Sequence, residues 1–413
     1  MWWVGLVTIP GVLLLVLYLA LYFAAWSWLA NRKKSLFILP AGWVALEYLR
    51  AHCFSGLGWN LLAHTQWNFF PVIQIADSTG VWGVSFLIVL VNAALAAAII
   101  RRRLCKELVV AALIFAAVLG YGAFRMSSQK KLDSVKIAVT QGNIPQREKW
   151  DDAFMDAIWK RYKVVVHDAA GQKPDAIILP ETALPVYWEE PRVPERIAEW
   201  VRTNKVPMLA GIPTADLQTE QVYNSAVWVG ADGVEQARYS KIHLVPFGEF
   251  MPLRPILGWL KEYFPIADFS PGRQWTVFSL PPISFSVLIC FEDLFPELAR
   301  QFVLRGAQSL LVITNDAWFE RSAGSLQHVQ ASVFRAVENR VCVGRAANTG
   351  WSGFIDPVGR RYGAVKLFKP GVSIQPVWAS GVRSIYTRTG DWFPWLCWIV
   401  VVIIGGLWKR SNS

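Results

Sequence analysis

Three polar residues, each beside the end of an apolar run, give this sequence its clearest chemical signal. Cys290 closes the run FSVLI and is followed by Phe-Glu-Asp. Glu181 follows IILP, and Lys241 stands in YSKIHLVPFGEF. A lone cysteine after an apolar run is most often an inert core thiol, but a thiol accompanied by a carboxylate and an ammonium group can serve as an activated nucleophile. The order Glu, Lys, Cys therefore points to covalent acyl transfer.

Such side chains need a rigid scaffold, and the sequence from Ser134 onward predicts a sheet. Short apolar runs predict strands near 135–140, 175–179, 206–211, 223–229, 285–290, 308–313, 341–346 and 352–356. Amphipathic periodicity predicts helices over 151–169, 192–204, 295–305 and 325–339. GADGVE (230–235) predicts a hairpin turn. Mixed strands and helices over roughly 250 residues indicate one α/β domain whose strand-end loops present the reactive groups.

The composition is too apolar for an ordinary soluble enzyme. Of the 413 residues, 54% are hydrophobic, and the mean hydropathy is positive. A bilayer-spanning helix needs roughly 20 mostly apolar residues, and five runs are candidates: 2–29, 36–51, 80–100, 108–124 and 392–408. The run 36–51 is the weakest because it is short and contains Glu47 and Arg50. We therefore expect membrane helices over 1–126, a catalytic domain over 127–391, and a last helix with a short tail over 392–413.

Clusters of basic residues predict the orientation of these helices. Lys and Arg gather at 32–34, 101–103 and 409–410, and such clusters mark cytoplasmic helix ends. All three lie on one side only if 36–51 crosses the membrane, which puts 127–391 on the outer side. The first run is long and lacks a charged leader, so no cleaved signal peptide is expected.

Several other classes of protein and site are not expected. The net charge of +11 is largely accounted for by the basic helix ends, so no nucleic-acid partner is predicted. The five cysteines show no CxxC spacing, which argues against a disulfide framework. The histidines are scattered singly, so no metal site and no cofactor are predicted.

The three motifs with their flanks resemble the nitrilase superfamily, whose αββα sandwich carries a Glu-Lys-Cys triad. Further segments make most of the chain, from near residue 40 onward, similar to the apolipoprotein N-acyltransferases of the bacterial inner membrane. The matching segments are SGLGWNLLAHTQWN (55–68), QGNIPQREKWD (141–151), PETALP (180–185), KIHLVPFGEF (241–250), ICFED (289–293), NDAWF (315–319) and NTGWSG (348–353). The resemblance implies a periplasmic nitrilase-like α/β domain flanked by transmembrane helices.

The sequence departs from the family pattern in three places. Phe291 stands where the family commonly has Tyr, and Glu320 where it usually has Gly. Family members usually carry seven helices before the domain, whereas four are predicted here. The N-terminus therefore looks shortened by three helices, an odd number that keeps the basic ends on one side.

The resemblance implies a two-step exchange. Cys290 attacks an ester carbonyl of a phospholipid acyl donor, releases a lysophospholipid and keeps the acyl chain as a thioester. The α-amino group of a lipoprotein's diacylglyceryl-cysteine, the acceptor, then attacks this thioester. Glu181 is expected to act as the base. Lys241 is expected to stabilise the tetrahedral oxyanion together with the backbone N–H of Phe291.

Four residues are expected to support the triad or the substrate. Glu249 is predicted to orient Lys241 or the incoming amine, with an ordinary salt bridge as the alternative. Glu292 either supports the nucleophile or caps the following helix. Trp150 either lies near the substrate or is a core or membrane-interface tryptophan. Phe291 lacks the hydroxyl of the family's usual tyrosine.

A lipid substrate also requires a route from the membrane to the thiol. The segment 250–269 carries eight large apolar side chains between active-site motifs, and we expect it to form an arm that dips into the lipid boundary. The alternative is a small satellite core under a long loop. The eight residues are Met251, Leu253, Ile256, Leu257, Trp259, Leu260, Phe264 and Ile266.

Two other functions are compatible with parts of the sequence. A membrane-tethered nitrilase-type amidase would use the same triad, because water and an amine attack the same thioester. A non-catalytic membrane scaffold is the other alternative, and Phe291 and Glu320 are the residues that favour it. The membrane half and the apolar segment favour the acyltransferase over the amidase, and the intact Glu181, Lys241 and Cys290 argue against the scaffold.

Overall fold

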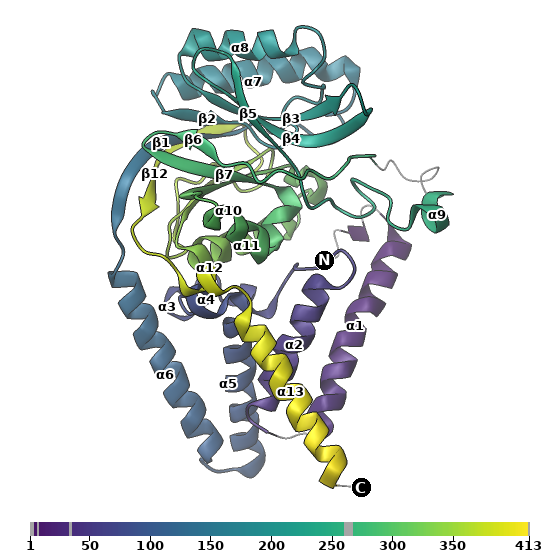
Figure 1. Ribbon diagram of the computed structural model, residues 1–413, viewed down its shortest axis with the longest axis vertical. Coiled ribbons are helices and arrows are strands. Elements are labelled where there is room, and N and C mark those ends of the chain that lie inside the picture. Colours follow the sequence, from purple (N-terminus) through teal and green to yellow (C-terminus); the bar gives the residue numbers. More distant parts are fainter. Residues whose placement is uncertain (1–3, 6–7, 33–34, 260–266, 412–413) are drawn as a thin grey trace.

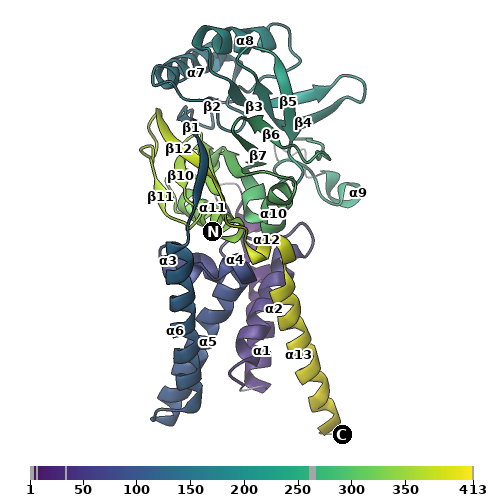
Figure 2. The same ribbon diagram turned by 60° about the vertical axis from the view of Figure 1, so that its left-hand side comes forward.

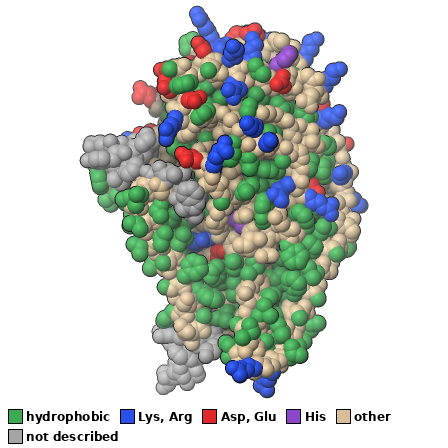
Figure 3. Space-filling view, turned by 180° about the vertical axis from the view of Figure 1, so that it is seen from behind, with side chains coloured by type: hydrophobic (Ala, Val, Ile, Leu, Met, Phe, Trp, Pro, Cys, Tyr) green, Lys and Arg blue, Asp and Glu red, His purple; other side chains and the backbone are tan. Residues whose placement is uncertain are grey.

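The computed structural model describes residues 4–5, 8–32, 35–259 and 267–411, which form a bundle of long helices beneath a larger α/β part (Figure 1). The bundle helices run roughly along the same direction and come from both ends of the chain. They are α1 (Ile9–Arg32), α2 (Ile38–His52), α5 (Val81–Arg101), α6 (Lys106–Ser127) and α13 (Trp392–Ser411). Hydrophobic side chains dominate the surface of the bundle, whereas charged side chains cover the α/β part (Figure 3).

Within the part of the chain that the structure describes, three of these helices are long and apolar enough to cross a membrane: α1, α5 and α6. The α2 helix, predicted as a span over 36–51, has only 15 residues and is largely buried. At 1.5 Å per residue it is roughly 22 Å long, shorter than the ~30 Å hydrocarbon core. It still reverses the chain direction between α1 and α5, so the α5–α6 turn with Arg101–Arg103 lies at the end of the bundle opposite the α/β part (Figure 1).

Short elements between α2 and α5 join the bundle to the α/β part. They are η2 (Leu62–Gln66), α3 (Phe70–Ile73) and α4 (Ala76–Thr79). The Asp77 carboxylate is fully buried and lies 2.6 Å from Arg125 Nη2 on α6 and 2.7 Å from Arg340 Nη2 of the α/β part. Arg340 also donates to Gln74 Oε1. This buried, charge-paired cluster fixes the two parts against each other.

The α/β part contains two six-stranded sheets packed face to face. The first has the order β12-β1-β2-β3-β4-β5 and the second the order β11-β10-β9-β8-β7-β6. The strands of the first sheet are β1 (Lys131–Gln141), β2 (Ala176–Ile178), β3 (Met208–Asp216), β4 (Gln221–Val229), β5 (Glu235–Ser240) and β12 (Gly371–Ser380). The second sheet consists of β6 (Phe278–Leu280), β7 (Ile283–Ile289), β8 (Ser309–Thr314), β9 (Cys342–Ala347), β10 (Gly353–Ile355) and β11 (Arg361–Tyr362).

Helices cover the outer face of each sheet (Figure 2). Those over the first sheet are α7 (Met155–Ala170) and α8 (Val193–Asn204), and those over the second are α10 (Pro296–Leu304) and α11 (Gly324–Asn339). Two shorter helices, α9 (Arg254–Leu257) and α12 (Ile385–Thr389), complete the α/β part. The predicted αββα sandwich is confirmed, and each of the four predicted covering helices is present within a few residues of its expected limits.

The alternation of β1 shows why the sandwich forms. Ile137 and Val139 belong to the core between the sheets, whereas Ala138 packs with the helices over the first sheet. Both faces of the strand are thus buried, as a two-fold side-chain period allows. Besides β5, the second strand of the hairpin that GADGVE predicts, the structure adds three strands to the eight predicted: β6, β11 and β12. The last contains Pro376 and lies at a sheet edge, where a missing N–H costs no hydrogen bond.

Candidate active site

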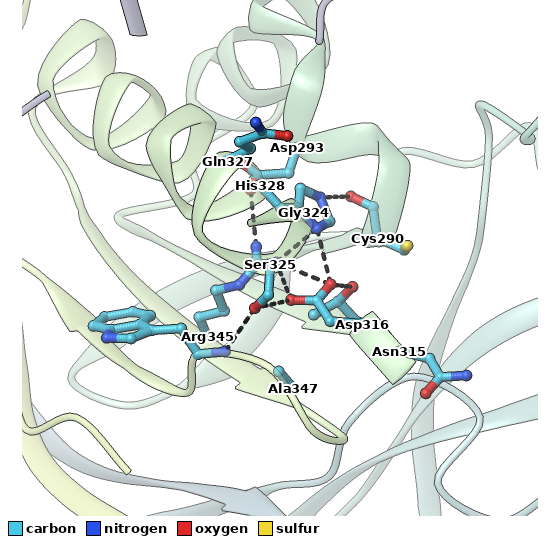
Figure 4. Close-up of polar contacts among 12 residues, drawn as sticks. Cys290, Asp293, Asn315, Asp316, Gly324, Ser325, Gln327, His328, Arg345 and Ala347 are labelled. Atoms are coloured by element: carbon cyan, nitrogen blue, oxygen red, sulfur yellow. Dashed lines mark hydrogen bonds and ion pairs between the residues drawn. The ribbon is translucent and has the colours of Figure 1, made fainter. Parts of the chain in front are cut away.

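The backbone at Cys290 turns sharply as it leaves β7. The residue has φ 53°, in the left-handed region that non-glycine residues rarely adopt. His328 Nε2, on α11, donates to the Cys290 carbonyl oxygen at 3.1 Å and so holds the turn. Figure 4 shows the sulfur pointing away from the polar cluster beneath it. The thiol of Cys290 is half-buried and is not in a disulfide. Cys290 therefore lies at the end of a strand, β7, as the sequence predicts.

The Glu181 carboxylate is held by two hydrogen bonds after the end of β2. Its Oε1 accepts from Asn224 Nδ2 at 2.7 Å, and its Oε2 accepts from the backbone N–H of Asn315 at 2.7 Å. The side chain is almost fully buried. Because both oxygens are engaged, the carboxylate has one orientation available to it.

Lys241 directly follows β5, and its Nζ is buried between two carboxylates. Nζ lies 2.8 Å from Glu249 Oε2 and 3.7 Å from Glu181 Oε1. Burial alone lowers the pKa of Lys241, but the charges of Glu249 and Glu181 outweigh it and hold the pKa well above its usual range. Lys241 is therefore a permanent cation beside the thiol at any working pH.

Asn224, on β4, is a member of this cluster that the sequence analysis missed. Its Nδ2 donates to Glu181 Oε1 and, at 2.8 Å, to Glu249 Oε1. One amide thus aligns the two carboxylates that flank the lysine. No motif marks this role, because Asn224 lies within an ordinary strand and reaches Glu181 only through the pairing of β3 with β4.

The electrostatics of the site keep the resting nucleophile protonated. Burial raises the pKa of the Cys290 thiol, and the charge of Glu181 raises it further, while Lys241 lowers it in part. The net shift is upward. Attack therefore requires that a base remove the thiol proton as the new bond forms, and among the groups around the thiol Glu181 is an ionisable carboxylate of fixed orientation.

Glu292 does not cap the following helix, which was one of its two expected roles, because α10 has no side-chain cap. Its Oε1 accepts from Tyr239 Oη and from the backbone N–H groups of Ile242 and His243, at 2.7, 2.7 and 3.0 Å. Its Oε2 accepts from the N–H of Ile289 at 2.8 Å. Burial raises the pKa of Glu292, although these donors oppose the shift. The carboxylate ties the backbone beside Cys290 to the backbone beside Lys241.

Of the pair Lys149-Trp150, the lysine and not the tryptophan is buried at the site. The side chain of Trp150 is 55% exposed, so its alternative as a core residue is wrong. Lys149 is 2% exposed, and its Nζ donates to the Glu181 carbonyl oxygen at 3.0 Å. Burial lowers the pKa of Lys149 to about 8, although Glu181 and Cys290 raise it in part. Lys149 lies in the motif QREKWD, in which the sequence analysis selected the neighbouring Trp150 instead.

A fully buried ionic cluster lies under Cys290 (Figure 4). Arg345 Nη1 is 3.0 Å from Asp293 Oδ2, and Arg345 Nη2 is 3.2 Å from Asp316 Oδ2. Although burial raises the pKa of Asp316, the charge of Arg345 and the contact with His328 lower it well below its usual range. Arg345 Nη2 also lies 2.8 Å from His328 Nδ1. The same Nδ1 lies 3.0 Å from Asp316 Oδ1, so His328 joins the ionic cluster through Nδ1 and holds the Cys290 carbonyl through Nε2.

The expected apolar arm lies in part outside the described residues. Leu260, Phe264 and Ile266 belong to 260–266, of which nothing is described. Leu253, Ile256 and Trp259 are each at least 60% exposed around α9, which projects from the α/β part (Figure 1). Met251 was expected to be exposed with them, but it is 5% exposed because it packs inward beside the Glu249 loop.

Comparisons with known proteins match both parts of the chain. Residues 136–386 match the carbon-nitrogen hydrolase family, and residues 1–94 match the apolipoprotein N-acyltransferase N-terminal domain. The apolipoprotein N-acyltransferase of Geobacter metallireducens is 38% identical over 98% of this chain and 81% of its own length. That of Methylococcus capsulatus is 32% identical over 92% of this chain and 76% of its own length.

Solved structures are similar to the α/β part. Saccharomyces cerevisiae Nit3, a member of branch 10 of the nitrilase superfamily, is 19% identical and aligns with 60% of this chain and 91% of its own, with a TM-score of 0.48. An amidase from Nesterenkonia is 20% identical and aligns with 62% of this chain and 92% of its own, with a TM-score of 0.47.

Proposed function

The chain belongs to the apolipoprotein N-acyltransferase family, and we propose that Cys290 carries a fatty acyl chain from a phospholipid to the α-amino group of a lipoprotein's N-terminal diacylglyceryl-cysteine. The observation that carries this proposal is the buried arrangement of Glu181, Lys241 and Glu249 beside a strand-end thiol, in a domain seated on apolar helices. A thioester suits the exchange because one cysteine holds the acyl group while two bulky lipids replace each other.

In the first half-reaction, Cys290 Sγ bonds to the ester carbonyl carbon of the phospholipid while Glu181 takes the thiol proton. The tetrahedral intermediate collapses by breaking the bond to the glycerol oxygen. Glu181 returns the proton to that oxygen, so a lysophospholipid leaves and the acyl chain stays on sulfur. In the second half-reaction, the amine nitrogen bonds to the thioester carbon and Glu181 takes a proton from it. Glu181 then gives that proton to Cys290 Sγ as the carbon–sulfur bond breaks, so the amide forms and the free thiol is regenerated.

The oxyanion of each tetrahedral intermediate needs a positive partner. Lys241 is a buried cation held by Glu249, and its position is set before substrate binds. Together with the backbone N–H of Phe291, it supplies preorganised stabilisation, an effect typically worth roughly 100- to 1000-fold in rate per donor. The ring centroid of Phe291 lies 5.1 Å from that of Phe295, and the Phe291 side chain offers no hydrogen-bond donor.

We further propose that the protein lies in the bacterial inner membrane with its α/β part on the periplasmic side. Basic Arg101–Arg103 lie at the bundle end opposite that part, which supports a cytoplasmic location for this end (Figure 1). Exposed apolar side chains around α9 support a lipid-facing path to the thiol.

Intact-protein mass spectrometry after incubation with phospholipid and no acceptor tests the proposal. The wild type should gain the mass of one acyl chain, and a diacylglyceryl-cysteine peptide should remove it as an acylated peptide. Cys290→Ala should gain none, whereas Cys53→Ala, which removes another half-buried free thiol, should gain it normally. Release of the chain only as a free acid, even with acceptor present, would favour the amidase alternative.

A further inference from the structure

A cavity of about 470 Å³ lies where the helical bundle meets the α/β part. Its walls come from α1 and α2, which lie side by side (Figure 1), from the chain around residues 60–65, and from α11. Small-molecule sites typically enclose roughly 300–1,000 Å³. Phe23 lines the cavity on α1 and is 55% exposed on the apolar surface of the bundle, so the cavity borders the lipid-facing side.

Four polar side chains line this cavity with atoms that have no hydrogen-bond partner among the described residues. These atoms are Trp43 Nε1, Glu47 Oε2, Arg50 Nε, His64 Nδ1 and His64 Nε2. Glu47 is 5% exposed and His64 is 1% exposed. Glu47 Oε1 accepts from the Leu62 N–H at 2.6 Å. The carboxylate and the guanidinium share the cavity without pairing with each other.

Leaving so many polar atoms unmatched is costly. Each buried donor or acceptor without a partner carries its desolvation penalty uncompensated, and the penalty is larger if the group is charged. Burial lowers the pKa of His64 to about 3, so the ring is neutral and offers one donor and one acceptor. The cavity therefore presents two N–H donors from Trp43 and Arg50, an acceptor from Glu47, and both functions from His64, all within apolar walls.

From this arrangement we infer that the cavity binds a monoacyl glycerolipid of the lysophospholipid class. Its ester and phosphate oxygens accept from Trp43 and Arg50, its free glycerol hydroxyl donates to Glu47 or His64, and its acyl chain lies along the apolar side of α1. A diacyl lipid lacks that free glycerol hydroxyl and would leave the acceptors unmatched. The inference rests on the proposed function only for the source of such a lipid, since the first half-reaction releases one.

The cavity is also connected to the nucleophile. Gln327 lines it on α11 and accepts from Trp59 Nε1 at 3.1 Å. The next residue along the helix is His328, which holds the Cys290 carbonyl. A lipid in the cavity thus sits against the same helix that fixes the turn of the catalytic cysteine.

Photolabelling of the full chain in nanodiscs tests the inference. The probe is a lysophosphatidylethanolamine with a diazirine in its acyl chain, and labelled peptides are identified by mass spectrometry. Label should appear on α1 and α2, and unlabelled lysophospholipid should compete with it better than diacyl phospholipid does. Leu46→Trp, which fills the cavity, should reduce labelling about tenfold, the factor that corresponds to roughly 1.4 kcal/mol. Leu49→Trp, on the 40% exposed face of the same helix, should not.

The variant His64→Phe keeps an aromatic ring in the cavity wall but removes the hydrogen-bonding nitrogens of His64. The ring nitrogens of His64 make no hydrogen bond within the described structure, so this variant breaks none and should fold. It should weaken competition by lysophospholipid about tenfold, as expected for loss of one hydrogen bond of ordinary strength. Unchanged competition in this variant, or equal competition by diacyl lipid, would overturn the inference.

Cys290→Ala keeps this test independent of the proposed function. The cysteine does not line the cavity, so its variant should be labelled on α1 and α2 like the wild type. Labelling without any acyl-enzyme in the wild type would sink the proposed reaction and leave the lipid site standing. Label spread evenly over the outward faces of α5 and α6 would refute the lipid site alone.

Discussion

The pH dependence of acylation is expected to report on Lys149. Its buried ammonium contacts the Glu181 carbonyl and has a pKa of about 8. It is then about 90% charged at pH 7 and about 10% charged at pH 9. Since the charged form favours negative charge developing on sulfur and on the oxyanion, the rate should fall as the pH rises through 8. Above that pH the rate should fall by up to about tenfold per unit and level off at the slower rate of the enzyme with neutral Lys149.

The measurement is the rate of acyl-enzyme formation on Cys290 in a single turnover between pH 6 and 10, values chosen as roughly two units either side of the transition. Neutral Lys149 still donates to the Glu181 carbonyl, so the pH change removes the charge and leaves the contact in place. Lys149→Met removes both and should give a slow rate without the alkaline decline.

Lys149→Arg is the matched control, because a guanidinium stays charged over this whole range. It should lack the decline and should retain more activity than the methionine variant. An alkaline decline with the same midpoint in Lys149→Met would show that another group titrates, and the reasoning about Lys149 would be wrong.

Four further outcomes follow from the geometry. Lys241→Met should slow acyl-enzyme formation roughly 100- to 1000-fold, measured as the rate of mass gain. Asn224→Ala removes two hydrogen bonds to carboxylates, each worth roughly 1.5–3 kcal/mol, and should slow both half-reactions in single-turnover assays. Arg345→Met removes the guanidinium that two buried aspartates share, should cost about 3–5 kcal/mol and should lower the thermal unfolding midpoint in detergent. Changing Leu253 and Ile256 to Ser should reduce turnover of vesicle phospholipid while leaving alkylation of the thiol unchanged; equal turnover would refute the lipid-boundary role.

Local patterns were sufficient for much of the fold. Each covering helix of the sandwich has a clear apolar stripe, and strands such as β8 are short runs of apolar residues, so periodicity identifies them. The strand β12 was missed because polar residues and Pro376 interrupt its alternation. It is specified instead by its pairing with β1, about 240 residues away in the chain.

The site shows the same division. Glu181, Lys241 and Cys290 were predicted as a triad because each lies in a recognisable motif beside an apolar run. Asn224 and Lys149 were missed, because their importance comes from two contacts with the Glu181 loop across the sheet. A hydrogen bond between residues far apart in sequence leaves no periodic trace in either segment.

The sequence by itself indicated which residues are candidates for the chemistry, which segments are apolar enough to enter a membrane, and the class of the fold. These properties depend on residue type and on spacing along the chain. Only the tertiary structure decided which carboxylate orients Lys241, which member of the pair Lys149-Trp150 reaches the site, and where α2 and α11 enclose a cavity with unmatched polar atoms. These depend on distances between side chains from different elements, and such distances exist only once the sheets and helices have packed.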